Sequence, residues 1–154
     1  MNRGKTMCKF FLTCAVLITA PLAAFAGPKE EAFQVVEQFK AAFDASNVQG
    51  VVKLFATDSF FLGTVSPKII TTTADVDQYF QGLKQFMPRQ FKIEEYSTIV
   101  ISDRAVLFAG FDTFSQTMDG KVVETPARFT LLITKNDQGW RISHFHSSVR
   151  PKPQ

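Results

Sequence analysis

The spacing of apolar residues changes halfway along the chain, and this change limits the possible folds more than any other feature of the sequence. One stretch of the first half carries apolar side chains at the three- and four-residue spacing of a helix face: Ala32, Val35, Val36, Phe39 and Phe43. The second half is instead a series of β-rich runs: 91–101, 105–116, 122–134 and 140–147. Short turn sequences separate these runs, which predicts an antiparallel meander.

The first half predicts three helices. The first spans Lys29 to Ser46, and a short second helix follows Ser46-Asn47 and carries Val48, Val51, Val52 and Phe55. A third follows Thr72-Thr73 and ends before Pro88. Between the last two helices, 59–65 and 68–72 are expected to be short strands. Helices followed by a long curved sheet indicate an α+β fold, with the helices on the concave side and a cone open at one end.

Residues 1–26 have the layout of a cleavable signal peptide. Arg3, Lys5 and Lys9 precede an apolar stretch, and Ala24-Phe25-Ala26 supplies small residues before a cleavage point. The alternative is a retained N-terminal anchor. With cleavage, we expect a periplasmic or secreted protein that makes no membrane contact. Residues 27–150 would then form one domain, followed by a frayed tail at 151–154.

The part of the chain after the leader is formally neutral. The leader holds three of the 17 basic residues and none of the 14 acidic ones. A neutral domain lacks the positive field that nucleic-acid binding requires. Both cysteines also lie in the leader, so the domain has no disulfide and no thiol ligand, and we predict no cofactor. Fourteen of the 17 phenylalanines remain, enough for a large aromatic core.

Three segments of the second half carry a family resemblance: 115–120, 125–129 and 139–148, the last with the sequence Gly-Trp-Arg-Ile-Ser-His-Phe-His-Ser-Ser. They resemble the association (hub) domain of calcium/calmodulin-dependent protein kinase II and the SnoaL-like bacterial domains, within the nuclear-transport-factor-2-like superfamily. The resemblance implies a cone-shaped fold with a pocket at its open end and a sheet face used for self-association. No kinase domain is present, so kinase activity is not implied.

The resemblance also implies a ligand site. Pocket arginines of the hub family bind small carboxylates, and Arg128 stands where one of them stands, while Thr113 and Ser147 occupy the places of two others. We therefore expect a self-associating domain, a dimer or larger, that binds a small anionic or amphipathic molecule at Arg128, Thr113, Phe145 and Ser147. The superfamily also contains isomerases and dehydratases, so an enzyme using the same pocket is the alternative.

Three further residues are candidates for chemistry. His144 and His146 lie two apart on a predicted strand and so share one face, either as an acid–base pair or as structural residues. Without a nearby cysteine or a suitably spaced acid they are an incomplete zinc set, and we predict no metal. Asp112 is either a general base or a structural acid. If Thr113 lines the pocket, alternation makes Asp112 point away from it.

Overall fold

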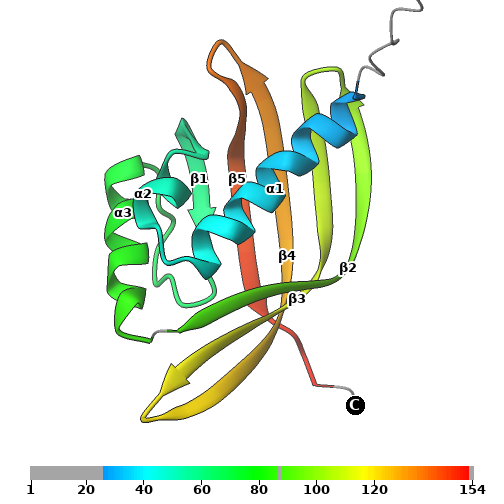
Figure 1. The fold of residues 1–154 in the computed structure, drawn as a ribbon. Helices are drawn as coiled ribbons and strands as arrows, with labels where there is room; N and C mark the ends of the chain where they lie inside the picture. The colour runs from blue at the N-terminus through cyan, green and yellow to red at the C-terminus, as the bar shows by residue number, and fades with distance from the viewer. Residues whose placement is uncertain (1–25, 87, 153–154) are drawn as a thin grey trace, which may run out of the picture.

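The computed structural model of the protein describes residues 26–86 and 88–152. Its helices are α1 (Pro28–Asp44), α2 (Val48–Val52) and α3 (Thr73–Gly82), followed by the short 3-10 helix η1 (Leu83–Phe86). Its strands are β1 (Phe55–Leu62), β2 (Arg89–Ser102), β3 (Ala105–Met118), β4 (Lys121–Asn136) and β5 (Gly139–Val149). The predicted α+β class is confirmed (Figure 1).

The strands form a single curved sheet in the order β1-β5-β4-β3-β2. Strands β2 to β5 pair antiparallel as the predicted meander, and β1 pairs parallel with β5 at the far edge. Helix α1 crosses the concave side of the sheet diagonally (Figure 1), while α2 and α3 lie beside β1. The arrangement leaves the sheet unclosed, as the cone description requires.

The segment between α2 and α3 differs from the prediction. Phe55 begins β1 instead of extending the second helix, and it lies opposite Ile142 of β5. The two short strands expected there are replaced by β1 and one isolated bridge between Phe61 and Ile70. Pairing with β5 decides the conformation of this segment, because a distant strand supplies the hydrogen bonds that its own sequence cannot specify.

The core is aromatic. All five residues of the predicted α1 stripe are buried, Phe39 among them. The ring of Phe39 packs against phenylalanine rings from α1, α3 and three strands, with centroid distances of 5.5–6.4 Å: Phe43, Phe55, Phe80, Phe91 and Phe145. Such ring pairs contribute about 0.5–1.5 kcal/mol each beyond their buried area. The cluster therefore holds α1 on the concave face without any disulfide.

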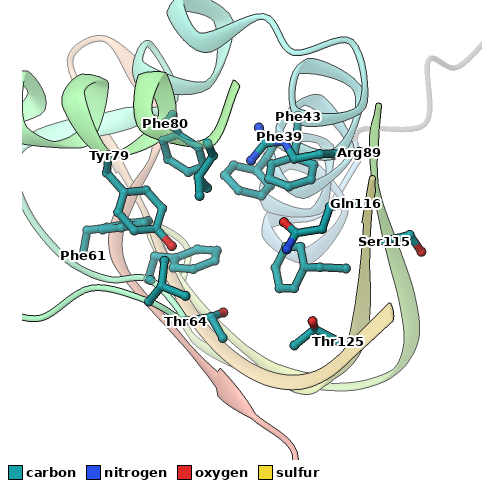
Figure 2. A pocket seen from close by; sticks show the side chains of 15 residues that line it. Phe39, Phe43, Phe61, Thr64, Tyr79, Phe80, Arg89, Ser115, Gln116 and Thr125 are labelled. Atoms are coloured by element: carbon teal, nitrogen blue, oxygen red, sulfur yellow. The ribbon is translucent and has the colours of Figure 1, made fainter. Parts of the chain in front are cut away.

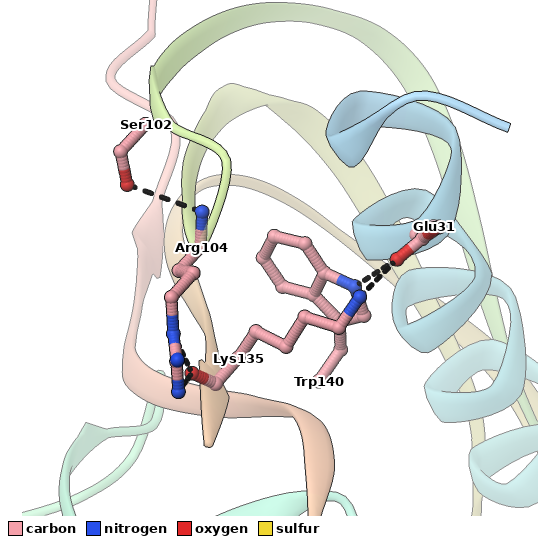
Figure 3. A network of polar contacts seen from close by, with 5 residues as sticks. All are labelled: Glu31, Ser102, Arg104, Lys135 and Trp140. Carbon is pink, nitrogen blue, oxygen red and sulfur yellow. Dashed lines mark hydrogen bonds and ion pairs between the residues drawn. The ribbon is translucent and has the colours of Figure 1, made fainter. Parts of the chain in front are cut away.

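A polar network fixes the other end of α1 (Figure 3). Glu31 accepts hydrogen bonds from Trp140 Nε1 at 2.7 Å and from Lys135 Nζ at 2.8 Å. These two bonds lower the pKa of Glu31. Arg104 donates to the carbonyl oxygen of Lys135, which ties the β2–β3 turn to the β4–β5 hairpin. The first turn of α1 is thereby attached to the sheet at the end opposite Phe43.

Gly110 allows β2 and β3 to cross closely. The pairing of these strands shifts between Ile93 and Glu95, so Glu94 is an extra residue opposite β3. A Cβ atom at Gly110 would lie 2.1 Å from the carbonyl oxygen of Glu95, a distance no side chain tolerates. The sheet therefore needs glycine where its edge strand bends.

We expect Gly110→Ala to lower the free energy of unfolding by about 2–3 kcal/mol, because the backbone must move to admit the methyl group. Gly82→Ala is the matched control, since a Cβ there would meet no atom within 4 Å. This control should be neutral or slightly stabilising at the end of α3. Urea unfolding followed by circular dichroism measures both, and equal values for the two variants would contradict the close crossing.

Candidate functional site

A pocket of about 90 Å³ opens on the concave side of the sheet. Figure 2 shows it enclosed by aromatic rings of α1 and α3 and by the outer parts of β3 and β4. The side chains and glycine that line it are Phe39, Phe43, Phe61, Gly63, Thr64, Val65, Tyr79, Phe80, Leu83, Arg89, Phe114, Ser115, Gln116, Thr125 and Phe145. Its walls are apolar except for a few polar groups, of which one carries a charge.

That charge belongs to Arg89, the first residue of β2. Its register position opposite Gln116 places it on the same face as Phe91, so the side chain enters the aromatic cluster. The guanidinium carbon lies 4.3 Å from the centroid of Phe43 (Figure 2), and the residue is only 4% exposed. Its Nε has no hydrogen-bond partner, and no carboxylate of the described residues pairs with it.

Burial lowers the pKa of Arg89, and the neighbouring Tyr79 partly opposes this effect. The guanidinium remains charged in this setting, because arginine holds its proton under all ordinary conditions. An unpaired buried cation is costly, and an anion that entered the pocket would relieve that cost. The pocket is therefore built to accept a negative group.

Tyr79 supplies a second polar group, from α3 on the side of the pocket opposite Arg89 (Figure 2). Its ring packs edge-on against Phe61 at 4.8 Å, and burial raises the pKa of its hydroxyl. The hydroxyl can approach the backbone of residue 63 only because that residue is glycine. A Cβ at Gly63 would lie 2.3 Å from Tyr79 Oη. At the pH values of ordinary solutions the hydroxyl is a neutral hydrogen-bond donor.

Two of the predicted ligand residues lie at this pocket. Phe145 lines it, and Ser147 is buried just behind the wall. The Ser147 hydroxyl shares a hydrogen bond of 2.7 Å with Thr64, which does line the pocket. Ser147 thus positions the loop after β1 and does not itself face the opening.

Arg128 and Thr113 lie on the other face of the sheet. Strands β3 and β4 pair without a register shift, so the faces of their residues follow from the buried pair Phe108 and Leu131. Arg128 and Thr113 each lie an odd number of residues from the member of that pair on their own strand. Their side chains therefore point to the convex side. There Arg128 Nε donates to Ser148 at 3.0 Å, and Thr113 donates to Glu94 at 2.7 Å. They do not line the concave pocket, and a ligand role for either stays a prediction.

The orientation of Asp112 is the reverse of our expectation. It points to the concave side between Phe108 and Phe114, it is fully buried, and neither carboxyl oxygen has a hydrogen-bond partner. Burial, with a smaller effect of the Glu94 charge, raises its pKa to about 7. Asp112 is nevertheless absent from the pocket wall and has no exposed surface, so this geometry does not present it as a general base.

The two histidines share the convex face, as their spacing predicts. His144 lies opposite Leu132 and His146 opposite Thr130. Burial and the neighbouring His146 lower the pKa of His144. Within residues 26–86 and 88–152, no three His, Cys, Asp or Glu side chains come together as a metal site would require.

Comparison with known proteins agrees with this fold. The sequence profile of the SnoaL-like domain family matches residues 33–151. The chain belongs to the SnoaL-like family. No curated protein sequence matches it.

Solved structures of the nuclear-transport-factor-2-like superfamily share the fold of this SnoaL-like chain. It is similar to a Xanthomonas campestris protein described as a calcium/calmodulin-dependent protein kinase II association domain, with 27% identity, a TM-score of 0.76, and coverage of 83% of this chain and 91% of that one. A Salmonella enterica serovar Typhimurium member of the superfamily has 19% identity, a TM-score of 0.71, and coverage of 82% and 94%. A Streptomyces avermitilis protein described as a dehydratase has 12% identity, a TM-score of 0.72, and coverage of 81% and 97%.

Sequence reasoning about this SnoaL-like chain missed Arg89, although the signal was present. Arg89, Phe91 and Ile93 alternate at the two-residue period of a strand, which places the arginine on the apolar face. Pro88, the residue before it, was interpreted only as the end of the preceding helix.

Among the described residues, no helix is both long enough and apolar enough to span a membrane.

The buried Asp112 predicts a pH-dependent stability. Its folded-state pKa of about 7 lies above its ordinary value of 3.8, so the folded protein holds the proton more tightly than the unfolded chain. This contribution is fully present below about pH 4 and is lost as the pH rises to about 7. We expect the free energy of unfolding of the wild type, measured relative to that of Asp112→Asn, to fall by on the order of 4 kcal/mol between about pH 4 and about pH 7.

Urea unfolding at a series of pH values measures this difference. Asp103→Asn, in the exposed turn between β2 and β3, controls for the loss of one carboxyl group and should show no comparable trend. A difference between wild type and Asp112→Asn that stays constant from pH 4 to pH 8 would overturn the assignment.

Proposed function

We propose that this chain is an exported, self-associating protein that binds a small carboxylic acid in its concave pocket, with Arg89 as the anchor. The observation that carries the proposal is the buried guanidinium of Arg89, which has no anionic partner among the described residues. A carboxylate matches the planar donor fork of arginine and can accept two parallel hydrogen bonds.

The rest of the pocket suits the remainder of such a ligand. Aromatic rings form most of its wall, and they favour an apolar group next to the carboxylate. Gln116 lies opposite Arg89 in the strand register, so its amide is well placed to add a hydrogen bond to the same carboxylate. Tyr79 provides a neutral donor for a polar substituent on the far side.

Export and self-association rest on other observations. Export is supported by the signal-like layout of residues 1–26, of which 1–25 lie outside the described residues. Self-association is supported by the similarity to a protein described as an association domain. It is also supported by the apolar side chains Phe60 and Ile99, which are exposed on the convex face of the sheet.

An enzyme of the dehydratase or isomerase kind is the second candidate. Its support is the unpaired Asp112 carboxyl with its raised pKa, together with neighbours described as dehydratases. Conversion of a substrate would require the ligand to reach a group that the pocket wall covers. Binding without turnover is therefore the function that this geometry favours.

Titration calorimetry with butanoate tests the anchor. We expect Arg89→Gln to weaken binding about 30- to 100-fold, because a charge-assisted bidentate contact is lost from a site with little water. The uncharged analogue butanamide should bind the wild type about as weakly as butanoate binds Arg89→Gln. Arg128→Gln is the matched control, since this arginine lies on the opposite face and should leave the affinity unchanged.

Two results would contradict the proposal. One is equal butanoate affinity in the wild type and in a folded Arg89→Gln variant, and the other is a loss caused by Arg128→Gln instead. Native mass spectrometry of the protein expressed with its leader adds the subunit number and shows whether the leader is removed.

A further inference from the structure

The pocket is too small to hold an entire amphipathic ligand. Its volume of about 90 Å³ is smaller than the cavity of roughly 150 Å³ that holds one benzene molecule. A carboxylate and one or two carbon atoms fill that space. Any longer acid bound at Arg89 must continue through the mouth of the pocket and lie on the surface beyond it.

The surface beyond the mouth carries apolar side chains on the side that the pocket faces, with Lys121 opposite Met118 at its outer end. Strands β3 and β4 continue outward from the pocket residues Gln116 and Thr125, and the next side chains on the same face are Met118 and Val123. Val123 lies directly opposite Gln116 in the register. Val65, in the loop after β1, both lines the pocket and is 67% exposed.

These three side chains, Val65, Met118 and Val123, form what we call the apolar rim. Exposed apolar residues scattered singly need no explanation, but these are continuous with the wall of a pocket. The Gln116 amide also donates to Met118 Sδ at 3.3 Å, which connects the rim to the residue opposite Arg89. The rim extends the apolar lining outward by about 7 Å along the strands, two residues at roughly 3.4 Å each.

We propose that the ligand is a straight-chain carboxylic acid of about eight carbon atoms, whose hydrocarbon tail leaves the pocket and lies on the apolar rim. This inference rests on the proposed function, because Arg89 must hold the carboxylate for the tail to start from the pocket. The length follows from the dimensions: the pocket takes the carboxylate and its nearest carbons, and about 7 Å of rim covers roughly five more methylene groups.

A chain-length series tests this directly: titration calorimetry of the mature protein with butanoate, hexanoate, octanoate and decanoate. Each buried methylene contributes about 0.8 kcal/mol, and one buried on a single side contributes about half of that. We therefore expect the affinity to rise about two- to fourfold per methylene up to octanoate. The rise should then level off, because decanoate extends past the rim.

Two substitutions of the same size separate the rim from a general effect of chain length. Val123→Thr should remove much of the gain for octanoate while changing butanoate affinity little, because only the end of the butanoate chain extends beyond the pocket. Val122→Thr makes the same chemical change on the neighbouring residue, which points to the other face and is 71% exposed. It should leave the whole series unchanged.

The outcomes distinguish the inference from the proposed function. Equal affinities for butanoate and octanoate, with Arg89→Gln still weakening both, would overturn the tail site and leave the anchor in place. No dependence on Arg89 for any acid would overturn both. A subunit number that changes in Val123→Thr but not in Val122→Thr, with an unaltered chain-length series, would assign the rim to contact between copies and overturn the tail site.

Discussion

The packing of Phe39 of α1 against rings from α3 and three strands is the contact on which the other features depend. It holds the helix against the concave face, and the Glu31 network holds the other end of the same helix. The sheet can keep its curvature under the helix because Gly110 lets the edge strand cross closely. A chain without a disulfide in its described part thus obtains a rigid concave wall from ring packing.

The pocket forms where this ring packing stops. Phe43 and Phe114 belong to the aromatic cluster and also line the opening, so the wall is as well fixed as the core itself. Into this wall the first residue of β2 inserts a guanidinium, at a cost in folding free energy that apolar residues of similar size would avoid. A protein that keeps such a group gains a preorganised anion site, because the cation needs no rearrangement to meet a carboxylate.

Asp112 and Arg89 are two buried ionisable groups on one concave face, and neither forms an ion pair with a described residue. Along the β2–β3 ladder, the stacked rings of Phe91 and Phe114 lie between their positions. The two groups differ in what burial does to them. The carboxyl can become neutral by taking up a proton, whereas the guanidinium cannot lose one. Only the arginine therefore calls for a ligand of opposite charge.

The sequence by itself determined the elements with a clear period: the buried stripe of α1, the meander of four long strands and the shared face of the two histidines. It also indicated the family, through residues near its C-terminus. Only the tertiary structure decided three other features. These are the face to which each strand's residues point, the parallel pairing of β1 with β5 and the identity of the pocket cation. Alternation shows which residues share a face, but not whether that face is concave. Arg128 and Thr113 were therefore expected in the pocket and lie outside it, while Arg89 lies inside, because the register of the folded sheet places Arg89 among the phenylalanines.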